Sequence, residues 1–327
     1  MKDRQFWLVV GLISLLIFLF WLAGAPYFVT DRTVMFFAIF ILGATLIYNI
    51  RYAERGGEVY LRPIPGLKAV EEFENMCSIL KKNGINIIVF ENDENKKLTD
   101  DVFPNNWISF HGDKYIIHSM YAKSRRGEKN KSFIKTLSSH NFNYTLLNDY
   151  TNYEIEDVFL EGTGSVVLDR VNKHAYCSIS KRSNVDLFKL FCDDIGYKPI
   201  SFKSYDSRGD LIYHTNVMMS IGDDFALVCF ESIKDKNEKI LVKESLEKRG
   251  RKIVEITLNQ VDCFAGNLIQ LGDKKNKIIV ISELAYSSLN NDQKNILSAE
   301  SKIVNIPIPT IQKCGGGSVR CMIAELI

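Results

Sequence analysis

The sequence predicts an α/β fold in which five similar units close on one another as the blades of a propeller do. Helical periodicity, with apolar residues at i and i+3 or i+4, recurs along the chain at a spacing of roughly 50–60 residues. A strand-like run directly follows each helical segment, and further apolar runs separate the units. Repeats at such a spacing are typical of closed or stacked arrays. An open α/β sheet is the alternative, but the regular spacing favours closure.

The first unit shows the pattern from which the others are recognised. Val70, Phe73, Met76 and Leu80 form one apolar stripe, which predicts a helix that ends before Gly84. The helix and strand of the five units are expected at residues 70–82 and 85–90, 131–139 and 142–147, 185–195 and 198–202, 240–248 and 252–257, and 292–299 and 302–308. Further strands are expected at residues 115–118, 165–168, 225–229 and 278–281.

Two apolar segments precede these units. Residues 6–25 and 34–50 are almost continuously apolar, and about 20 such residues span a bilayer. A signal peptide is the alternative for the first segment, but its apolar stretch is too long and a second one follows at once. We therefore expect a transmembrane helical hairpin over residues 1–56 and a separate α/β domain over residues 57–327.

Basic residues predict how this hairpin is oriented. Lys2 and Arg4 flank one end, and Arg51 and Arg55 flank the other. The positive-inside rule then places both termini, and with them the α/β domain, in the cytoplasm. The expected localisation is a multi-pass membrane protein with two helices.

Composition excludes several classes of function. The chain has 327 residues, 46% of them hydrophobic, and a net charge of +2, which gives no electrostatic basis for binding nucleic acid. The seven cysteines are scattered without a CxxC pair or a zinc-type spacing, so a reducing compartment fits better than a disulfide framework. We expect neither a metal nor an organic cofactor, and the sequence leaves the oligomeric state open.

A cysteine beside a glycine run is the strongest indication of chemistry. Cys314 opens the motif CGGGSVRC, and a glycine run lets the backbone take positive φ and approach a ligand closely. A thiol in such a loop suits a nucleophile, although a buried structural thiol is the alternative.

Two upstream motifs supply the groups that such a thiol requires. Glu161 stands in FLEGTGS, and His214 stands in YHTNVMM. We expect the second motif to be a strand that presents His214 and Asn216 on one face. A turn-capping glutamate and a core histidine are the structural alternatives.

Asparagines and arginines are candidates for binding a substrate. Asn105 and Asn106 follow a proline in VFPNNW, as a turn or as the lip of a pocket. Arginine in a pocket binds a carboxylate through two parallel hydrogen bonds, whereas arginine pairs in loops are more often solvated. The candidates are Arg125, Arg126 and Arg182.

Together these motifs resemble the guanidine-modifying superfamily, which has the pentein fold and includes arginine deiminase, dimethylargininase and glycine amidinotransferase. The resemblance is greatest to bacterial citrulline hydrolase-type proteins and covers about residues 60–327. The residues that carry it are VFPNNW (102–107), FLEGTGS (159–165), YHTNVMM (213–219), FAGN (264–267) and CGGGSVRCM (314–322).

The resemblance implies a five-bladed α/β propeller and a role for each candidate. Cys314 would be the nucleophile and His214 the general acid and base, while Glu161 would pair with the histidine or with a substrate N–H group. The backbone around Gly316 would help to hold an oxyanion. The α-carboxylate would be held by Arg182 with Arg125 or Arg126.

Two departures from the family pattern are informative. Guanidine-acting relatives carry aspartates at the positions of Asn106 and Asn216. An amide offers both a donor and an acceptor, so it suits a neutral ureido group better than it suits a cationic guanidinium. We therefore expect hydrolysis of citrulline to ornithine, ammonia and CO2. Arginine dihydrolase, dimethylargininase and amidinotransferase activities are alternatives. The first unit is also shorter than in relatives, so a membrane-anchored pseudoenzyme is the alternative from another class.

Overall fold

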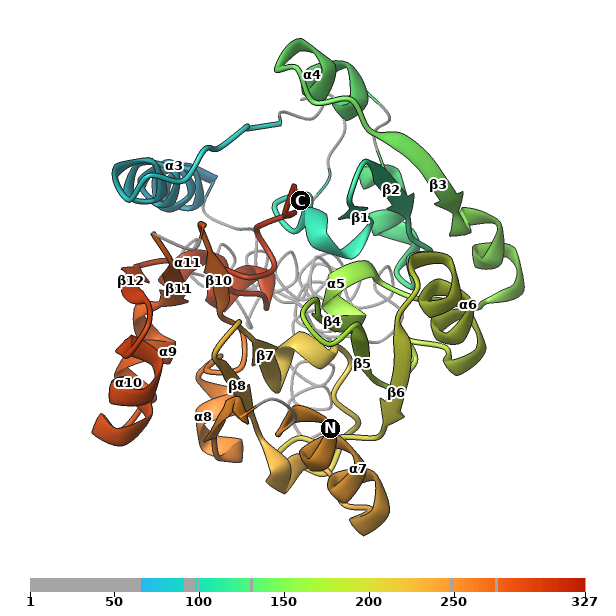
Figure 1. Ribbon diagram of the computed structural model, residues 1–327. Helices are drawn as coiled ribbons and strands as arrows, with labels where there is room; N and C mark the ends of the chain where they lie inside the picture. The colour runs from blue at the N-terminus through green and yellow to red at the C-terminus, as the bar shows by residue number, and fades with distance from the viewer. Residues whose placement is uncertain are drawn as a thin grey trace, which may run out of the picture. The chain divides into compact units, whose positions relative to one another are not determined.

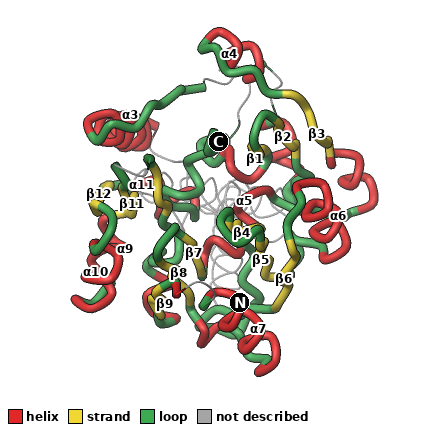
Figure 2. Tube along the Cα trace, viewed as in Figure 1, coloured by secondary structure: helices red, strands yellow, loops and turns green. Residues whose placement is uncertain are grey.

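The computed structural model describes residues 66–90, 98, 100–129, 132–247, 250–273 and 276–326. These residues fall within one compact unit, Ile64–Ile327. In the part of the chain that is described, four three-stranded sheets follow one another in chain order (Figure 1). The helices that connect the second and third strands of each sheet lie on the outer side of the strands (Figure 2).

Each sheet is built in the same way, from an antiparallel pair followed by a parallel pair. The third strand of each sheet is parallel because a helical connection carries the chain back before it starts. The strands are β1 (Ile108–His111), β2 (Lys114–Ile117) and β3 (Thr145–Asp149); β4 (Val166–Asp169), β5 (His174–Ser178) and β6 (Lys198–Phe202); β7 (Met219–Ile221), β8 (Phe225–Val228) and β9 (Lys252–Glu255); and β10 (Ile269–Leu271), β11 (Ile278–Ser282) and β12 (Lys302–Ile306).

Local sequence signals fix where the connecting helices start and stop. Asn184 caps α6 by accepting hydrogen bonds from the backbone N–H groups of Asp186 and Leu187, and Gly196 ends it in the left-handed conformation. The α-helices are α3 (Gly66–Lys82), α4 (Phe133–Ser139), α5 (Gly162–Ser165), α6 (Val185–Ile195), α7 (Lys236–Leu246), α8 (Leu258–Asp262), α9 (Glu283–Ser288), α10 (Asn291–Ser298) and α11 (Pro309–Gly315). Short 3₁₀ helices are η1 (Pro104–Asn106), η2 (Lys123–Glu128), η3 (Tyr150–Glu156), η4 (Thr215–Val217) and η5 (Phe230–Ser232).

The predicted α/β class is confirmed, and most predicted elements lie where they were expected. Two expectations are wrong. Residues 85–90 form no strand, although the preceding helix is present as α3. The His214 motif is not a strand, because Thr215–Val217 turns into η4. Closure into five blades stays a prediction, since the described residues contain four sheets.

The two ends of the described unit contact each other. The carboxylate of Glu72, in α3, accepts hydrogen bonds from the backbone N–H groups of Thr310 and Ile311 at 2.8 and 2.9 Å. These donors lie in the first turn of α11, where N–H groups have no partner within the helix. The first helix therefore caps the last one.

The predicted localisation requires correction. In the described ranges, no helix is both long and apolar enough to cross a membrane. The two predicted spans, residues 6–25 and 34–50, and their orientation lie outside those ranges. Because the described residues contain no such helix, the prediction of a multi-pass membrane protein is withdrawn.

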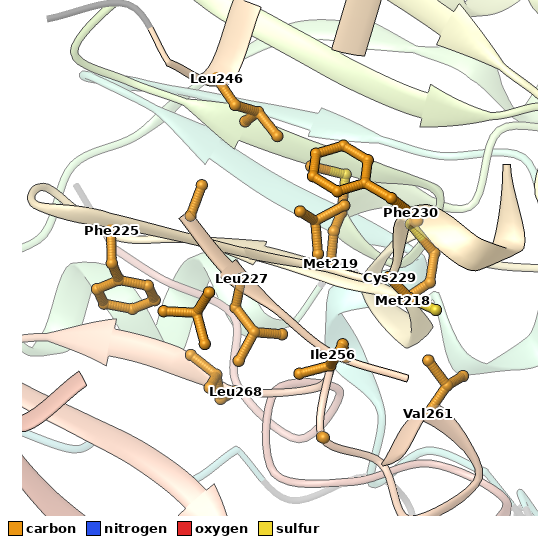
Figure 3. Close-up of a cluster of buried hydrophobic side chains, with 14 of the residues drawn as sticks. Met218, Met219, Phe225, Leu227, Cys229, Phe230, Leu246, Ile256, Val261 and Leu268 are labelled. Atoms are coloured by element: carbon orange, nitrogen blue, oxygen red, sulfur yellow. The ribbon is translucent and has the colours of Figure 1, made fainter. Parts of the chain in front are cut away.

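A buried apolar cluster holds the histidine segment in place. Met218 and Met219 follow η4 directly and are fully buried against Phe230, Leu227 and Leu246 (Figure 3). Burying a side chain of this size contributes about 1.5–3 kcal/mol. Because this anchor begins two residues after Asn216, the backbone of η4 is held against the core.

Candidate active site

Glu161 and His214 form a buried pair at the centre of the site. His214 Nε2 lies 2.6 Å from Glu161 Oε2, and the glutamate is fully buried. The same carboxylate accepts hydrogen bonds from the backbone N–H of Tyr121 at 2.9 Å and from Arg182 Nη1 at 3.3 Å. The structure thus brings three predicted site residues into contact.

The protonation of this pair follows from its surroundings. Burial would raise the pKa of Glu161, but Arg182 and His214 outweigh burial and hold that pKa well below its usual range. Burial lowers the pKa of His214, against the opposing effect of Glu161. A neutral imidazole whose Nε2–H donates to an ionised glutamate leaves Nδ1 able to accept a proton.

The glycine after Thr163 makes the close approach of two site residues possible. A Cβ at Gly164 would lie 2.2 Å from Asn106 Nδ2 and 3.0 Å from His214 Nδ1. Any larger residue would displace one of these side chains. The EGTG turn therefore sets Asn106 and His214 on either side of a position that only glycine can fill.

Asn106 is held by one arginine. It ends η1, and its Oδ1 accepts a hydrogen bond of 2.8 Å from Arg125 Nη1. Arg125 in turn donates to both oxygens of Glu128, at 2.9 and 2.8 Å. Asn106 Nδ2 is buried and has no partner among the described residues.

Asn216 lies in a second set of contacts, which sequence reasoning missed. Its Nδ2 donates to the carbonyl oxygen of Thr163 at 3.3 Å and lies 3.6 Å from Cys321 Sγ. Asn267 Nδ2 lies 3.3 Å from the same sulfur and 3.0 Å from the backbone oxygen of Asn216. In the described part of the chain, Asn216 Oδ1 is buried without a partner.

The two cysteines of the glycine motif therefore have different places. Cys314 is a half-buried free thiol in α11, which Gly316 ends in the left-handed conformation. Cys321 is buried and contacts both Asn216 and Asn267. The available signal was a second cysteine in the same motif, seven positions further on in the sequence.

The glycine run itself lies beside the site. Tyr213, next to His214, donates a hydrogen bond of 3.0 Å to the carbonyl oxygen of Gly316. Cβ atoms at Gly315 and Gly317 would each lie 2.8 Å from the Phe103 ring, which precedes the two asparagines of η1. The run is thus packed between two segments that carry site residues.

The three arginines predicted as carboxylate ligands differ in how they are used. Arg125 is buried and its donors are directed at Glu128, Asn106 and backbone oxygens. Arg126 Nε donates to the carbonyl oxygen of Met120 at 3.0 Å. The Arg182 guanidinium stacks 5.0 Å from the centre of the Tyr213 ring. Arg125 thus holds the Asn106 amide, and the predicted carboxylate clamp of Arg182 with Arg125 or Arg126 stays a prediction.

A cavity of about 110 Å³ reaches the site from the side of β4, β7 and β10. Thr163 and Asn216 line it at one end, and Arg251 and Asp169 form a bidentate ion pair in its wall. Asn216 thus lines this cavity and also contacts Cys321. Over the described residues, no group of three or more His, Cys, Asp or Glu side chains could hold a metal ion.

Solved structures share the fold. The cyanobacterial arginine dihydrolase ArgZ matches with a TM-score of 0.63 and 20% identity over 80% of this chain, which spans 38% of ArgZ. The N-terminal domain of ArgZ covalently bound to a reaction intermediate matches with a TM-score of 0.63 and 19% identity, over 80% of this chain and 86% of the domain. A dimethylarginine dimethylaminohydrolase adduct with 4-chloro-2-hydroxymethylpyridine matches with a TM-score of 0.55 and 16% identity, over 78% of this chain and 90% of that chain.

The sequence places the chain in a family. No curated protein sequence matches it significantly. The sequence model of eukaryotic N,N-dimethylarginine dimethylhydrolase matches residues 65–327, which is most of the chain and includes all the site residues described above. The predicted resemblance is thereby confirmed: the chain belongs to the N,N-dimethylarginine dimethylhydrolase family, within the guanidino-modifying pentein superfamily.

Proposed function

We propose that the protein is a cysteine hydrolase that cleaves a C–N bond of a ureido amino acid, converting citrulline to ornithine, ammonia and CO2. One observation carries the choice of substrate. Among the described residues, the site offers buried unpaired amide donors, Asn106 Nδ2 and Asn105 Nδ2, and buried unpaired amide acceptors, Asn216 Oδ1 and Asn105 Oδ1. Buried polar atoms without partners in a site are the atoms that a ligand is expected to satisfy.

A ureido group complements Asn106 Nδ2 and Asn216 Oδ1 better than a guanidinium does. Its oxygen accepts a hydrogen bond and its N–H groups donate, so it satisfies both asparagines. A guanidinium has donors alone and would face the N–H of Asn106. The ionised carboxylate nearby, Glu161, is already paired with Arg182, so it does not offset the cost of burying a cation.

We propose Cys321 as the nucleophile in place of Cys314. Cys321 Sγ lies within 3.6 Å of Asn216, which is two residues from His214. The amide nitrogen of Asn216 lies 3.6 Å from the sulfur, and Asn267 contacts the sulfur with its amide nitrogen at 3.3 Å and its amide oxygen at 3.7 Å. The family resemblance implied Cys314 as the nucleophile instead, and variants of the two cysteines test one proposal against the other.

The mechanism has two steps. His214 takes the thiol proton, and the sulfur attacks the ureido carbon; the bond from that carbon to the δ-nitrogen breaks, and His214 protonates the departing amine of ornithine. The remaining S-carbamoyl cysteine is attacked by water that has given a proton to His214. Its C–S bond breaks and releases carbamate, which decomposes to ammonia and CO2. A covalently bound reaction intermediate is reported for the ArgZ domain, which supports a covalent step.

The family match favours a second candidate, hydrolysis of dimethylarginine or arginine. These substrates are guanidino compounds that share the amino-acid end of citrulline. In that case an N–H group of the bound guanidino substrate would face the N–H group of Asn106, which places two donors together. This candidate predicts different products, so one assay separates the two functions.

We also retain two structural proposals. A boundary near residue 57 begins the catalytic domain, and the domain closes into five units around the site. The hydrogen bonds from α11 to Glu72 support closure, because they join the first unit to the last. In this arrangement the short first unit contributes helix α3 to the closed set of five units.

The test is a product assay on the full chain with citrulline, arginine and asymmetric dimethylarginine. We expect ornithine and ammonia from citrulline, at least tenfold faster than any product from the other two. Cys321→Ser should lower the rate at least about 1,000-fold, whereas the matched Cys314→Ser should change it less than about threefold. Dimethylamine or citrulline as the main product would favour the family's guanidino chemistry. No turnover of any of the three would support a pseudoenzyme.

A further inference from the structure

Asn106 has a neighbour that decides which way its amide faces. A carboxamide can rotate by half a turn and exchange its oxygen for its NH2 group, with little change in shape. Arg125 Nη1 lies 2.8 Å from Asn106 Oδ1. Because a guanidinium has no acceptor, the rotated amide would place one donor against another at a buried position. Arg125 therefore keeps the oxygen inward and directs Nδ2 to the site.

Arg125 can do this because it is itself held. Its Nε and Nη2 donate to the two oxygens of Glu128 in a bidentate pair, at 2.9 and 2.8 Å. Nη2 also lies 3.3 Å from the carbonyl oxygen of Phe103. Arg125 and Glu128 are 5% and 1% exposed, so solvent does not compete for these bonds. Two parallel bonds fix the plane of the guanidinium, which a single contact would leave free to turn.

Glu128 is set apart from the catalytic groups. It belongs to η2, and its described contacts are with Arg125. The charged carboxylate of Glu128 fixes the plane of the Arg125 guanidinium. The proposed mechanism gives Glu128 no part in proton transfer. Any effect of Glu128 on the reaction would pass through Arg125 to the amide of Asn106.

We propose that Glu128 is a positioning residue that sets the substrate class, by holding Arg125 so that Asn106 presents a donor to a substrate oxygen. This inference rests on the proposed ureido hydrolase function and explains its selectivity. Without the carboxylate, the guanidinium keeps contacts of 3.2 and 3.3 Å to the backbone oxygens of Asp100 and Phe103 and one of 3.9 Å to the Asp100 carboxylate, but it loses its bidentate partner. Its plane can then turn, and the Asn106 amide can rotate. The rotated amide presents an oxygen, which accepts a hydrogen bond from a guanidino N–H. Loss of Glu128 then weakens the preference for ureido over guanidino substrates.

Protonation of Glu128 should have the same effect as its removal. Burial raises the pKa of Glu128 to about 7, against the lowering effect of Arg125. Asp100 and Asp101 raise the same pKa by like-charge repulsion. The preference for citrulline should therefore fall as the pH drops through this region. The protonation of His214 acts on both substrates, so a ratio of rates cancels its contribution.

The experiment measures the ratio of kcat/KM for citrulline to kcat/KM for arginine. In Glu128→Gln we expect this ratio to fall at least tenfold, mainly through a higher KM for citrulline, and to lose its dependence on pH between 6 and 8. Glu128→Asp, which keeps the charge, should retain part of the preference. A control outside the site and its cavity is Asp194→Asn, which removes a carboxylate that accepts hydrogen bonds from Tyr150 and Asn148. Its ratio should equal that of the wild type.

The outcomes separate this inference from the function on which it rests. A wild-type protein that prefers arginine overturns the proposed function. A wild-type protein that prefers citrulline, together with an unchanged ratio in Glu128→Gln, overturns the role of Glu128 alone. If Glu128→Gln does not fold, Asn106→Asp serves in its place, because a carboxylate presents an oxygen in either orientation. A citrulline preference undiminished in Asn106→Asp would refute the inference.

Discussion

The candidate site has two halves that differ in how their polar atoms are satisfied. In the paired half, the carboxylate of Glu161 accepts hydrogen bonds from His214, from Arg182 and from a backbone N–H group. In the open half, four buried amide atoms of Asn105, Asn106 and Asn216 have no partner among the described residues. The paired half is built by the protein alone. The open half is expected to be completed by the substrate, so mutations in the two halves should affect stability in opposite directions.

The largest expected effect comes from removing the charge in the paired half. Glu161→Gln leaves the Arg182 guanidinium without its carboxylate at a buried position, which should lower the free energy of unfolding by about 3–5 kcal/mol. Urea unfolding of the two proteins at pH 7 measures the loss. A decrease below about 1 kcal/mol would show that the paired half is not what stabilises this region.

A smaller effect is expected from the protonation of His214. Burial lowers the pKa of His214, so the unfolded chain, with a pKa near about 6.5, binds the proton first as the pH falls. The free energy of unfolding should thus decrease with acidification, by up to about 1.4 kcal/mol per pH unit below that value. His214→Gln should lack this contribution in unfolding experiments at pH 7 and pH 5.5.

Other histidines also contribute to the pH dependence of the free energy of unfolding. Burial also lowers the pKa of His111 and of His118 to about 3, and both contribute to the pH dependence of either protein. The difference between wild type and variant isolates His214. Equal slopes in the two proteins would mean that His214 titrates alike in the folded and unfolded states.

The smallest effect, with the opposite sign, is expected in the open half. Both amide atoms of Asn105 are buried without a partner in the described structure. Asn105→Leu removes these atoms from an apolar environment and should leave the free energy of unfolding unchanged or raise it by up to about 1 kcal/mol. The rate on citrulline should nevertheless decrease. A thermal melt with a parallel activity assay measures both, and a clear destabilisation would show that Asn105 is structurally satisfied.

The recurring units could be predicted from sequence because their signals are local. Helix α6 and strand β6 have the predicted bounds, since Asn184, Gly196 and the apolar periodicity between them act over a few residues. The run at residues 85–90 misled the same reasoning. Its side chains are apolar enough for a strand, but a strand also requires a neighbour to pair with. Ile85 and Ile87 pack against one buried cluster, while Ile88 and Phe90 pack against another.

The site was predictable in residue type more than in pairing. The motifs indicated Glu161 because glycines flank it, His214 and Asn216 because they are polar in an apolar run, and Asn105 and Asn106 because they follow a proline. The choice between Cys314 and Cys321 could not be made in this way, since both lie in one motif. It depends on where α11 ends and which loop then reaches Asn267, and these are tertiary facts. The contacts of Arg125 could likewise not be predicted from the sequence, because nothing in the sequence distinguishes Glu128 from any other carboxylate in a loop.

The segment that carries Cys321 also bears on how the protein folds. Val319 and Met322 pack in the same cluster as Met76 of α3. Further along the segment, Glu325 forms an ion pair with Arg170 at 3.4 Å. Cys321 and Asn216 are 105 positions apart, so their contact carries the entropy cost of closing a long loop. Under the proposed role of Cys321 as nucleophile, local detachment of this segment would stop catalysis while the sheets stay folded.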